Sequence, residues 1–158
     1  MLQDNSLDIA LIRTDNDPDQ VRYSTLLTEE IVALLPEDHH LAQHQSVSLE
    51  MFCQQPLVLF REGYFLRDVI SQYEKKHKLK INLQFETNLI ELLKKMVVKE
   101  VGISTCLPCA LDGSESLITR SFLPPITLSL GIGWKSNHYL STASRAFIDF
   151  MQQEIGKV

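Results

Sequence analysis

Residues 89–108 read LIELLKKMVVKEVGISTCLP, and this stretch decides the fold because it joins a helix to a strand through one glycine. Apolar residues at helical spacing predict one buried helix face, made of Leu89, Leu92, Leu93, Met96 and Val97. The solvent side is then expected to carry Lys94, Lys95, Lys99 and Glu100. Gly102 ends the helical pattern, and residues 103–107 form a short strand-like run that Pro108 closes.

A further strand is expected just before this helix. Apolar and polar residues alternate over residues 81–85, and Thr87 or Asn88 follows as a candidate helix cap. A strand, a helix and a second strand in this order form a βαβ crossover. Ligands of open α/β sheets bind beyond the carboxyl ends of parallel strands, near helix N-termini. We therefore expect a small-molecule site around residues 86–88 and 106–108.

The first part of the chain shows the patterns of three more strands. Residues 56–60 are apolar throughout, and residues 7–12 are apolar except for Asp8; such runs are typical of buried strands in a parallel sheet. Residues 30–35 predict another strand, and residues 16–20 predict a polar turn. Ser48 follows as the expected cap of a short helix, residues 49–53.

The remaining elements are expected at the following positions. Residues 64–76 predict a helix, and residues 117–122 predict an extended segment, after which Pro124 and Pro125 mark a break or a crossing. Residues 126–134 alternate as a strand with one exposed face. Ser141 is expected to cap a final amphipathic helix, whose inward residues would be Ala143, Phe147, Phe150 and Met151.

Composition places the chain among ordinary globular domains. It has 158 residues, of which 44% are apolar and 22% charged, with a formal net charge of −5. This acidic balance argues against nucleic-acid binding by the segment itself, and a short lysine group at residues 75–80 reads as a solvated helix end. The sequence shows no targeting signal, no membrane-spanning run and only three cysteines, so we expect a cytoplasmic location without membrane contact.

Five of these segments, taken in order, resemble the effector-binding domain of LysR-type transcriptional regulators. They are residues 7–12, residues 34–42, residues 47–50 with 56–59, residues 96–108, and the final helix with Ser141, Ala143 and Phe147. Glu100 stands where the family usually has glycine, and Thr142 replaces the family's proline. The family's helix-turn-helix, linker helix and opening βαβα portion have no counterpart, so DNA binding is expected only through a domain absent from this chain.

The resemblance implies an α/β, two-lobe fold of the type 2 periplasmic-binding-protein kind, with mixed, mostly parallel sheets. Lobe one would be incomplete and comprise residues 1–28 and 122–158, because Asp8 interrupts a strand that has few sheet neighbours. Lobe two would comprise residues 29–121. The hinge between them would include Glu30, Ile31, Ser121 and Phe122. Family members bind a small-molecule effector between the lobes and form homo-oligomers, and the physics of such a switch is a population shift.

The candidate ligand-binding residues lie at two strand-to-helix turns and after the short strand. In the turn at residues 60–65, glycine lets backbone N–H groups converge at a helix start, which suits a carboxylate. Arg61 or Arg67 would add a salt link, although an ordinary turn with solvated charges explains the same residues. The expected ligand-binding set is Arg61, Gly63, Tyr64, Phe65, Thr87, Asn88 and Pro108.

The sequence also contains residues that could serve redox, metal-binding or catalytic functions. Cys106 and Cys109 have redox C-x-x-C spacing, so a thiol-based redox sensor on this scaffold is the alternative function. The group His39, His40, His44 and Cys53 fits no established zinc spacing, and we expect no metal and no cofactor. Ser104, His138 and Asp149 lack a nucleophile elbow, so the sequence indicates no enzyme.

Overall fold

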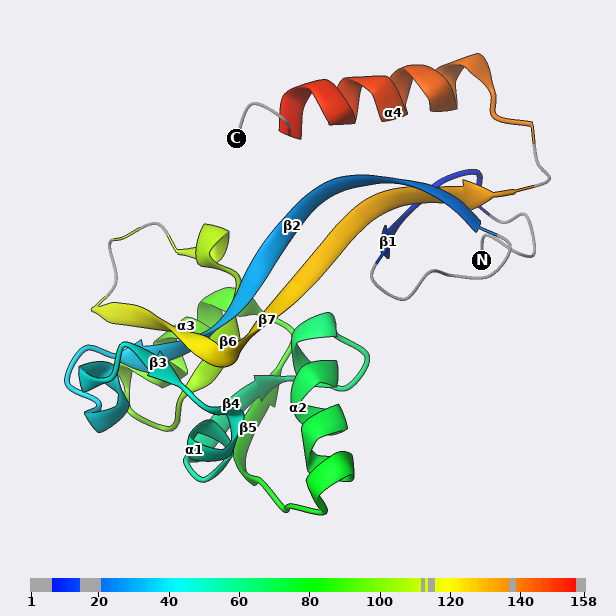
Figure 1. Cartoon of the computed structure of the whole chain (residues 1–158). Coiled ribbons are helices and arrows are strands. Elements are labelled where there is room, and N and C mark those ends of the chain that lie inside the picture. Colours follow the sequence, from blue (N-terminus) through cyan, green and yellow to red (C-terminus); the bar gives the residue numbers. More distant parts are fainter. Residues whose placement is uncertain (1–6, 15–20, 112, 114–115, 137–138, 156–158) are drawn as a thin grey trace. The chain divides into compact units, whose positions relative to one another are not determined.

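The computed structural model describes residues 7–14, 21–111, 113, 116–136 and 139–155, so the turn expected at residues 16–20 lies outside the described part. Figure 1 labels the helices and strands. In chain order they are β1 (Ala10–Arg13), β2 (Val21–Pro36), η1 (His40–Gln43), β3 (Ser46–Val47), α1 (Leu49–Cys53), β4 (Pro56–Phe60), α2 (Phe65–His77), β5 (Asn82–Thr87), α3 (Ile90–Val98), β6 (Ser104–Cys106), η2 (Pro108–Ala110), β7 (Leu117–Lys135) and α4 (Thr142–Ile155).

The chain forms two compact units. Unit 1 comprises Met1–Glu29 with Thr127–Val158, and unit 2 comprises Glu30–Ile126. The chain changes unit inside the two long strands β2 and β7. Unit 2 therefore holds the helix, glycine and strand at residues 89–108, together with all the expected ligand-binding residues.

Two sheets carry the fold, and the expected α/β class is confirmed. One sheet has the strand order β1-β7-β2-β6, with β3 pairing on β7, and the second sheet is the pair β4-β5. Pairing is antiparallel in β1-β7 and β2-β6, and parallel in β3-β7 and β4-β5. A parallel bridge joins Leu57 of β4 to Ile103, so the run that leads into β6 lies beside β4 and completes the expected crossover.

The core of unit 2 forms under α3. The cluster of buried side chains comprises Val32, Leu34, Val58, Phe60, Leu93, Val97, Cys106 and Leu117. These residues come from β2, β4, α3, β6 and the start of β7, so one apolar face of α3 covers strands from both sheets. Ser48 caps α1 as expected, because its Oγ accepts a hydrogen bond from the Met51 N–H at 3.1 Å.

One strand prediction is wrong. Residues 7–12 were expected to be a buried parallel strand, but β1 pairs antiparallel with β7 and exposes 61% of Leu11. Since β1 ends the strand order of its sheet, its apolar residues have a sheet neighbour on one side only. At Pro124 and Pro125, where the sequence predicts a break or a crossing, the structure has the crossing. Strand β7 continues through both prolines, which are exposed and have no N–H group to pair, and the chain changes unit directly after them, between Ile126 and Thr127.

The solvent-facing side of α3 also differs from the expectation. Lys94 is buried, and its Nζ lies 3.0 Å from Glu91 Oε1, so its aliphatic stem packs inward while its ammonium group finds a carboxylate. Leu89 was expected on the apolar face but is 60% exposed, since it is the residue that precedes the first turn.

The final helix buries a different face from the one predicted. Phe147 and Phe150 are exposed rather than inward, and Ala143 is exposed as well. Ser144 and Ile148, four residues apart, form the buried stripe instead. Ser141 Oγ accepts the Ser144 N–H at 3.0 Å, so the expected cap is present. None of the helices in the described ranges is both long enough and apolar enough to cross a bilayer.

Candidate functional site

The two predicted strand-to-helix turns lie side by side in unit 2. Strands β4 and β5 run parallel, and Phe60 is paired with Thr87 at their carboxyl ends. The Arg61 N–H then donates a hydrogen bond to the Thr87 carbonyl oxygen at 3.2 Å. The first candidate turn is thereby tied to the second, at the position where α/β sheets bind ligands.

The turn between β4 and α2 is closed by backbone contacts and by one aromatic stack. Gly63 has φ +89°, a left-handed conformation that favours glycine, and the Tyr64 N–H donates to the Arg61 carbonyl oxygen at 3.3 Å. The Tyr64 ring stacks on Phe60, with ring centroids 5.6 Å apart. Tyr64 precedes α2 without a side-chain cap, while Arg67 and Asp68 donate their N–H groups to its carbonyl oxygen. The N-terminal N–H groups of α2 therefore have no side-chain cap, although the carboxylate of Asp68 lies in the first turn.

The turn has a positively charged residue, Arg61, and borders a depression lined mainly by carboxylates. The Arg61 side chain is exposed, whereas Gly63 borders a polar depression whose other residues include Glu62, Asp68 and Glu74. Lys75 lines the depression as well, but among its described residues the three carboxylates outnumber this one cation, so the depression repels an anion. An anion would therefore fit the Arg61 and Thr87 side of the turn better than the depression.

Arg67 does not extend toward the turn, where a salt link to a ligand was expected. Its side chain is buried, with Nη2 3.6 Å from Glu74 Oε2 and Nε 3.9 Å from Glu86 Oε1. Its Nε and Nη1 have no hydrogen-bond partner among the described residues. Arg67 thus lies between α2 and β5 as part of an internal charge group, and Arg61 is the exposed arginine of this turn.

The start of α3 is built differently from the prediction. Thr87 is buried, and its Oγ1 accepts the Leu89 N–H at 3.1 Å, but the residue that directly precedes the helix is Leu89. Asn88 is exposed beside it. The Thr87 hydroxyl uses a lone pair for the contact with Leu89, so its proton is still available to another acceptor.

The cysteine pair after the short strand has unequal surroundings. Cys106 is fully buried in the core of unit 2, whereas Cys109 is exposed, and both are free thiols. Burial, with a smaller contribution from Cys109, raises the pKa of Cys106 to about 12 although nearby Lys94 lowers it. Cys106 is therefore a neutral thiol at physiological pH. Pro108 begins η2 and is exposed.

The expected hinge residues occupy β2 and β7. Glu30 is the first residue of unit 2, and Ile31 is fully buried behind it. Ser121 and Phe122 lie within unit 2, where they pair with Ser46 and Val47 of β3.

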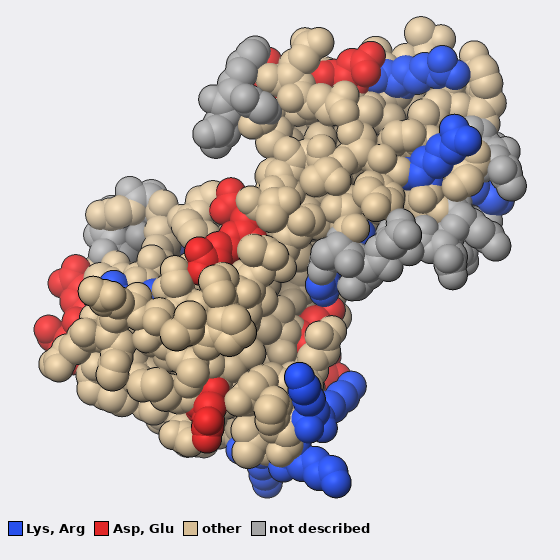
Figure 2. Space-filling model, in the orientation of Figure 1, with Lys and Arg blue, Asp and Glu red and all other residues tan. Residues whose placement is uncertain are grey.

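The remaining polar groups do not form a metal centre. In the described ranges, no three His, Cys, Asp or Glu side chains are grouped so that they could hold a metal ion. Cys53 is buried, and its pKa is raised to about 11 mainly by that burial. The lysines at residues 75–80 are exposed, and Figure 2 shows blue side chains gathered at this end of α2. Sequence reasoning missed a cavity next to His39, because its walls come from segments far apart in the chain.

Comparison with known proteins places the sequence in a known family and the fold among those of solved structures. The sequence matches the LysR substrate binding domain family over residues 1–156. It is 26% identical over 152 residues to the uncharacterized HTH-type transcriptional regulator YybE of Bacillus subtilis (strain 168), covering 95% of this chain and 52% of that protein. The chain therefore spans about half the length of such curated relatives.

Two solved structures show the same fold at low identity. The regulatory domain of Synechocystis PCC6803 CcmR in complex with 2-PG has a TM-score of 0.83 and 17% identity, covering 98% of this chain and 76% of that one. The effector binding domain of QuiR in complex with shikimate has a TM-score of 0.79 and 21% identity, covering 99% of this chain and 75% of that one.

Proposed function

Because this chain belongs to the LysR substrate binding domain family, we propose that it is the ligand-sensing part of a transcriptional regulator. Its type 2 periplasmic-binding-protein-like fold is shared with the regulatory and effector-binding domains of CcmR and QuiR. The protein acts by binding and by conformational change, without covalent chemistry. DNA binding belongs to a helix-turn-helix domain outside these residues.

The ligand is a small anionic metabolite held at the carboxyl ends of β4 and β5. Support comes above all from the hydrogen bond between the Arg61 N–H and the Thr87 carbonyl oxygen, because it fixes both candidate turns to one another. Arg61 supplies an exposed guanidinium group, the start of α2 supplies partial positive charge, and Thr87 supplies a hydroxyl proton. Other contacts are assigned to Gly63, Tyr64, Phe65, Asn88 and Pro108.

The response to the ligand is a change in the arrangement of two lobes. In this proposal the lobes follow the two compact units, and Glu30, Ile31, Ser121 and Phe122 belong to the hinge. A ligand that binds one arrangement better than another shifts the population toward it, and a homo-oligomer transmits this shift to DNA. The free energy available for the shift equals the difference between the two affinities.

The thiol-switch alternative finds no support in the surroundings of Cys106. A reactive thiol has a lowered pKa and an accessible sulfur, whereas burial raises the pKa of Cys106 to about 12.

Thermal unfolding of the purified chain with a panel of organic acids tests the proposal. Shikimate and 2-PG belong in the panel, because the QuiR and CcmR domains bind them. A ligand at a hundredfold excess over its Kd stabilises the folded chain by about 2.7 kcal/mol. The stabilising acid should lose this effect with Arg61→Ala and Thr87→Val, while Lys76→Ala, which removes an exposed cation elsewhere, should keep it. An acid that stabilises wild type and Arg61→Ala equally would overturn the assignment of the site.

A further inference from the structure

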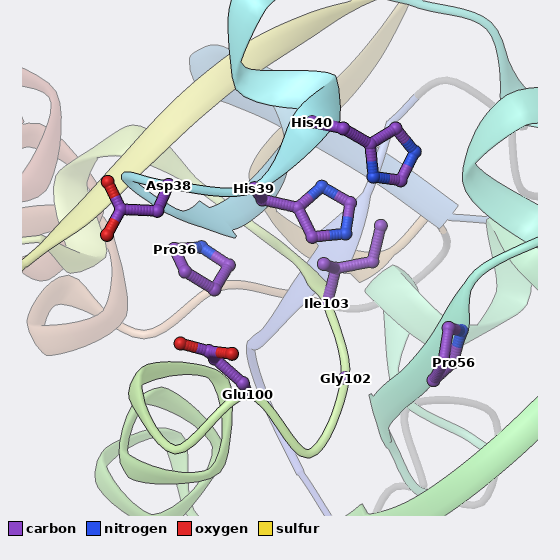
Figure 3. Close-up of a pocket in the computed structure, with 8 residues that line it drawn as sticks. All are labelled: Pro36, Asp38, His39, His40, Pro56, Glu100, Gly102 and Ile103. Carbon is purple, nitrogen blue, oxygen red and sulfur yellow. The ribbon is translucent and has the colours of Figure 1, made fainter.

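Unit 2 contains a second hollow that shares no residue with the proposed effector site. This cavity has a volume of about 300 Å³. Figure 3 shows residues from three segments around it, namely the end of β2 with η1, the start of β4 at Pro56, and the link from α3 to β6. Its polar lining is Asp38, His39, His40 and Glu100, and its apolar lining includes Pro36 and Ile103.

Glu100 occupies a backbone position where glycine would be the unstrained choice. It has φ +56°, and its N–H donates to the Val97 carbonyl oxygen at 2.9 Å while the Val101 N–H donates to Met96 at 3.0 Å. These two bonds form the Schellman motif that ends a helix, and its left-handed residue is usually glycine because a β-carbon is strained there. Glu100 therefore carries backbone strain that glycine would avoid, as does Lys78 at the end of α2 with φ +51°, and the exposed side chain of Glu100 lines the cavity.

His39 is held as a neutral hydrogen-bond donor on the opposite wall. Its Nδ1 accepts the Leu41 N–H at 3.2 Å, so the proton of the neutral ring is on Nε2. Burial, followed by the charge of His40, lowers the pKa of His39, although Glu100 raises it. The His40 ring lies against that of His39, with centroids 4.4 Å apart.

The side chain of Arg120 on β7 holds the segment that contains the histidines through hydrogen bonds to backbone carbonyl oxygens, and we call this contact the Arg120 clamp. The Arg120 Nε donates to the His44 carbonyl oxygen at 2.7 Å and to the Ala42 carbonyl oxygen at 3.0 Å. Its Nη1 donates to the carbonyl oxygen of Thr119 at 2.7 Å. The η1 wall is therefore fixed before any ligand arrives, which lowers the entropic cost of binding.

The charge of the lining selects the ligand. Asp38 and Glu100 are carboxylates, and no lysine or arginine is among the described residues that line the cavity. Burial lowers the pKa of His39 and thereby favours its neutral form, although Glu100 opposes this. In Figure 3 neither carboxylate points at the His39 ring, but Glu100 is the acid whose charge acts on His39. Two prolines and an isoleucine supply apolar contact, and the volume lies at the lower end of the range for small-molecule sites.

We propose that this cavity is a second ligand site, which binds a small aliphatic ammonium compound. The ammonium group pairs with the carboxylate of Glu100, and the aliphatic part packs against Pro36, Pro56 and Ile103. This site is additional to the proposed effector site and shares none of its residues. Either assignment can therefore fail without the other.

Titration of the isotope-labelled chain with n-butylammonium, followed by amide NMR shifts and calorimetry, tests the proposal. Sodium butyrate and n-butanol are the matched probes, because they keep the carbon chain and change the charge. The amides of residues 36–40 and 100–103 should shift with the amine, and much less with either control probe. Arg61→Ala should leave amine binding unchanged, which separates this site from the effector site.

Variants at Glu100 decide between a binding role and a structural role. Glu100→Gln and Glu100→Gly should each weaken amine binding by about tenfold or more, because an ion-paired hydrogen bond is lost. Glu100→Gly should also unfold at an equal or higher temperature, since it relieves the left-handed strain. Glu37→Gln, which removes an exposed carboxylate that does not line the cavity, should change binding less than twofold. Unshifted cavity amides, equal binding of butyrate, or full binding by both Glu100 variants would overturn the proposal.

Discussion

Gly102 passes so close to Pro56 that a β-carbon on Gly102 would stand 2.6 Å from the Pro56 carbonyl oxygen. The same oxygen accepts the Ile103 N–H at 2.9 Å, and the Val58 N–H donates to the Ile103 carbonyl oxygen at 2.9 Å. This close approach brings the run after α3 against β4. The two sheets of unit 2 are joined at this point.

Gly102→Ala should therefore destabilise the chain by about 2–3 kcal/mol, because the clash is with backbone and no flexible side chain can give way. Urea unfolding measures the loss. Gly113→Ala is the matched control, since Gly113 has φ +78° but open space around it, and it should cost about 1 kcal/mol. Equal losses from both substitutions would show that the approach to Pro56 is not tight in solution.

Arg120→Met should destabilise the chain by about 2 kcal/mol. The guanidinium group is a charged donor to the Ala42 and His44 carbonyl oxygens, and Ala42 is buried, so the methionine leaves an acceptor there without its donor. Hydrogen exchange of the His44 and Ala42 amides, which bond within η1, should become faster. Arg22→Met, at an exposed position of β2, should change neither quantity, and unaltered exchange in Arg120→Met would contradict the clamp.

Protonation of His39 should weaken the fold at mildly acidic pH. Burial and the charge of His40 lower its pKa from 6.5 in the folded chain, so the unfolded chain binds more protons in the window just below pH 6.5. The free energy of unfolding should then fall as the pH drops through this window. Denaturant unfolding of His39→Gln between pH 5 and pH 8 should show a flatter profile there, whereas His44→Gln should follow wild type. A steeper profile for His39→Gln would reverse the predicted sign.

Thiol labelling should separate the three cysteines by exposure. Cys109 is exposed, whereas burial raises the pKa of Cys106 to about 12 and that of Cys53 to about 11. Native chain at pH 8 should react quickly at Cys109, and at the other two sites only after unfolding. Peptide mapping identifies the labelled residue. A Cys106–Cys109 disulfide after peroxide treatment would revive the redox hypothesis.

Local patterns predicted the middle of the fold well. The helix at residues 64–76 corresponds to α2, and the βαβ crossover corresponds to β5, α3 and the run into β6. Apolar spacing and the serine before α1 determine these elements through contacts between near neighbours. Both turns after β4 and β5 were recognised as site candidates, whereas the pairing that brings them together is a tertiary contact.

The predictions failed where contacts with segments distant in the sequence determine which side chains are buried. Phe147 and Ile148 are both apolar, so sequence alone did not show that α4 would bury Ile148 and expose Phe147. The helical pattern placed Lys94 on the solvent side of α3, yet its side chain is buried. The cavity beside His39 combines residues 36–40 with residues 100–103, and only the structure brings these together.

The left-handed Glu100 has an evolutionary consequence. Every glutamate codon becomes a glycine codon by one change in its second base, and here that change also relaxes the main chain. A sequence under selection for folding alone therefore has a short path to glycine at this position. A family tree scored at this single position would show which regulators keep the glutamate on which the proposed amine-binding site depends.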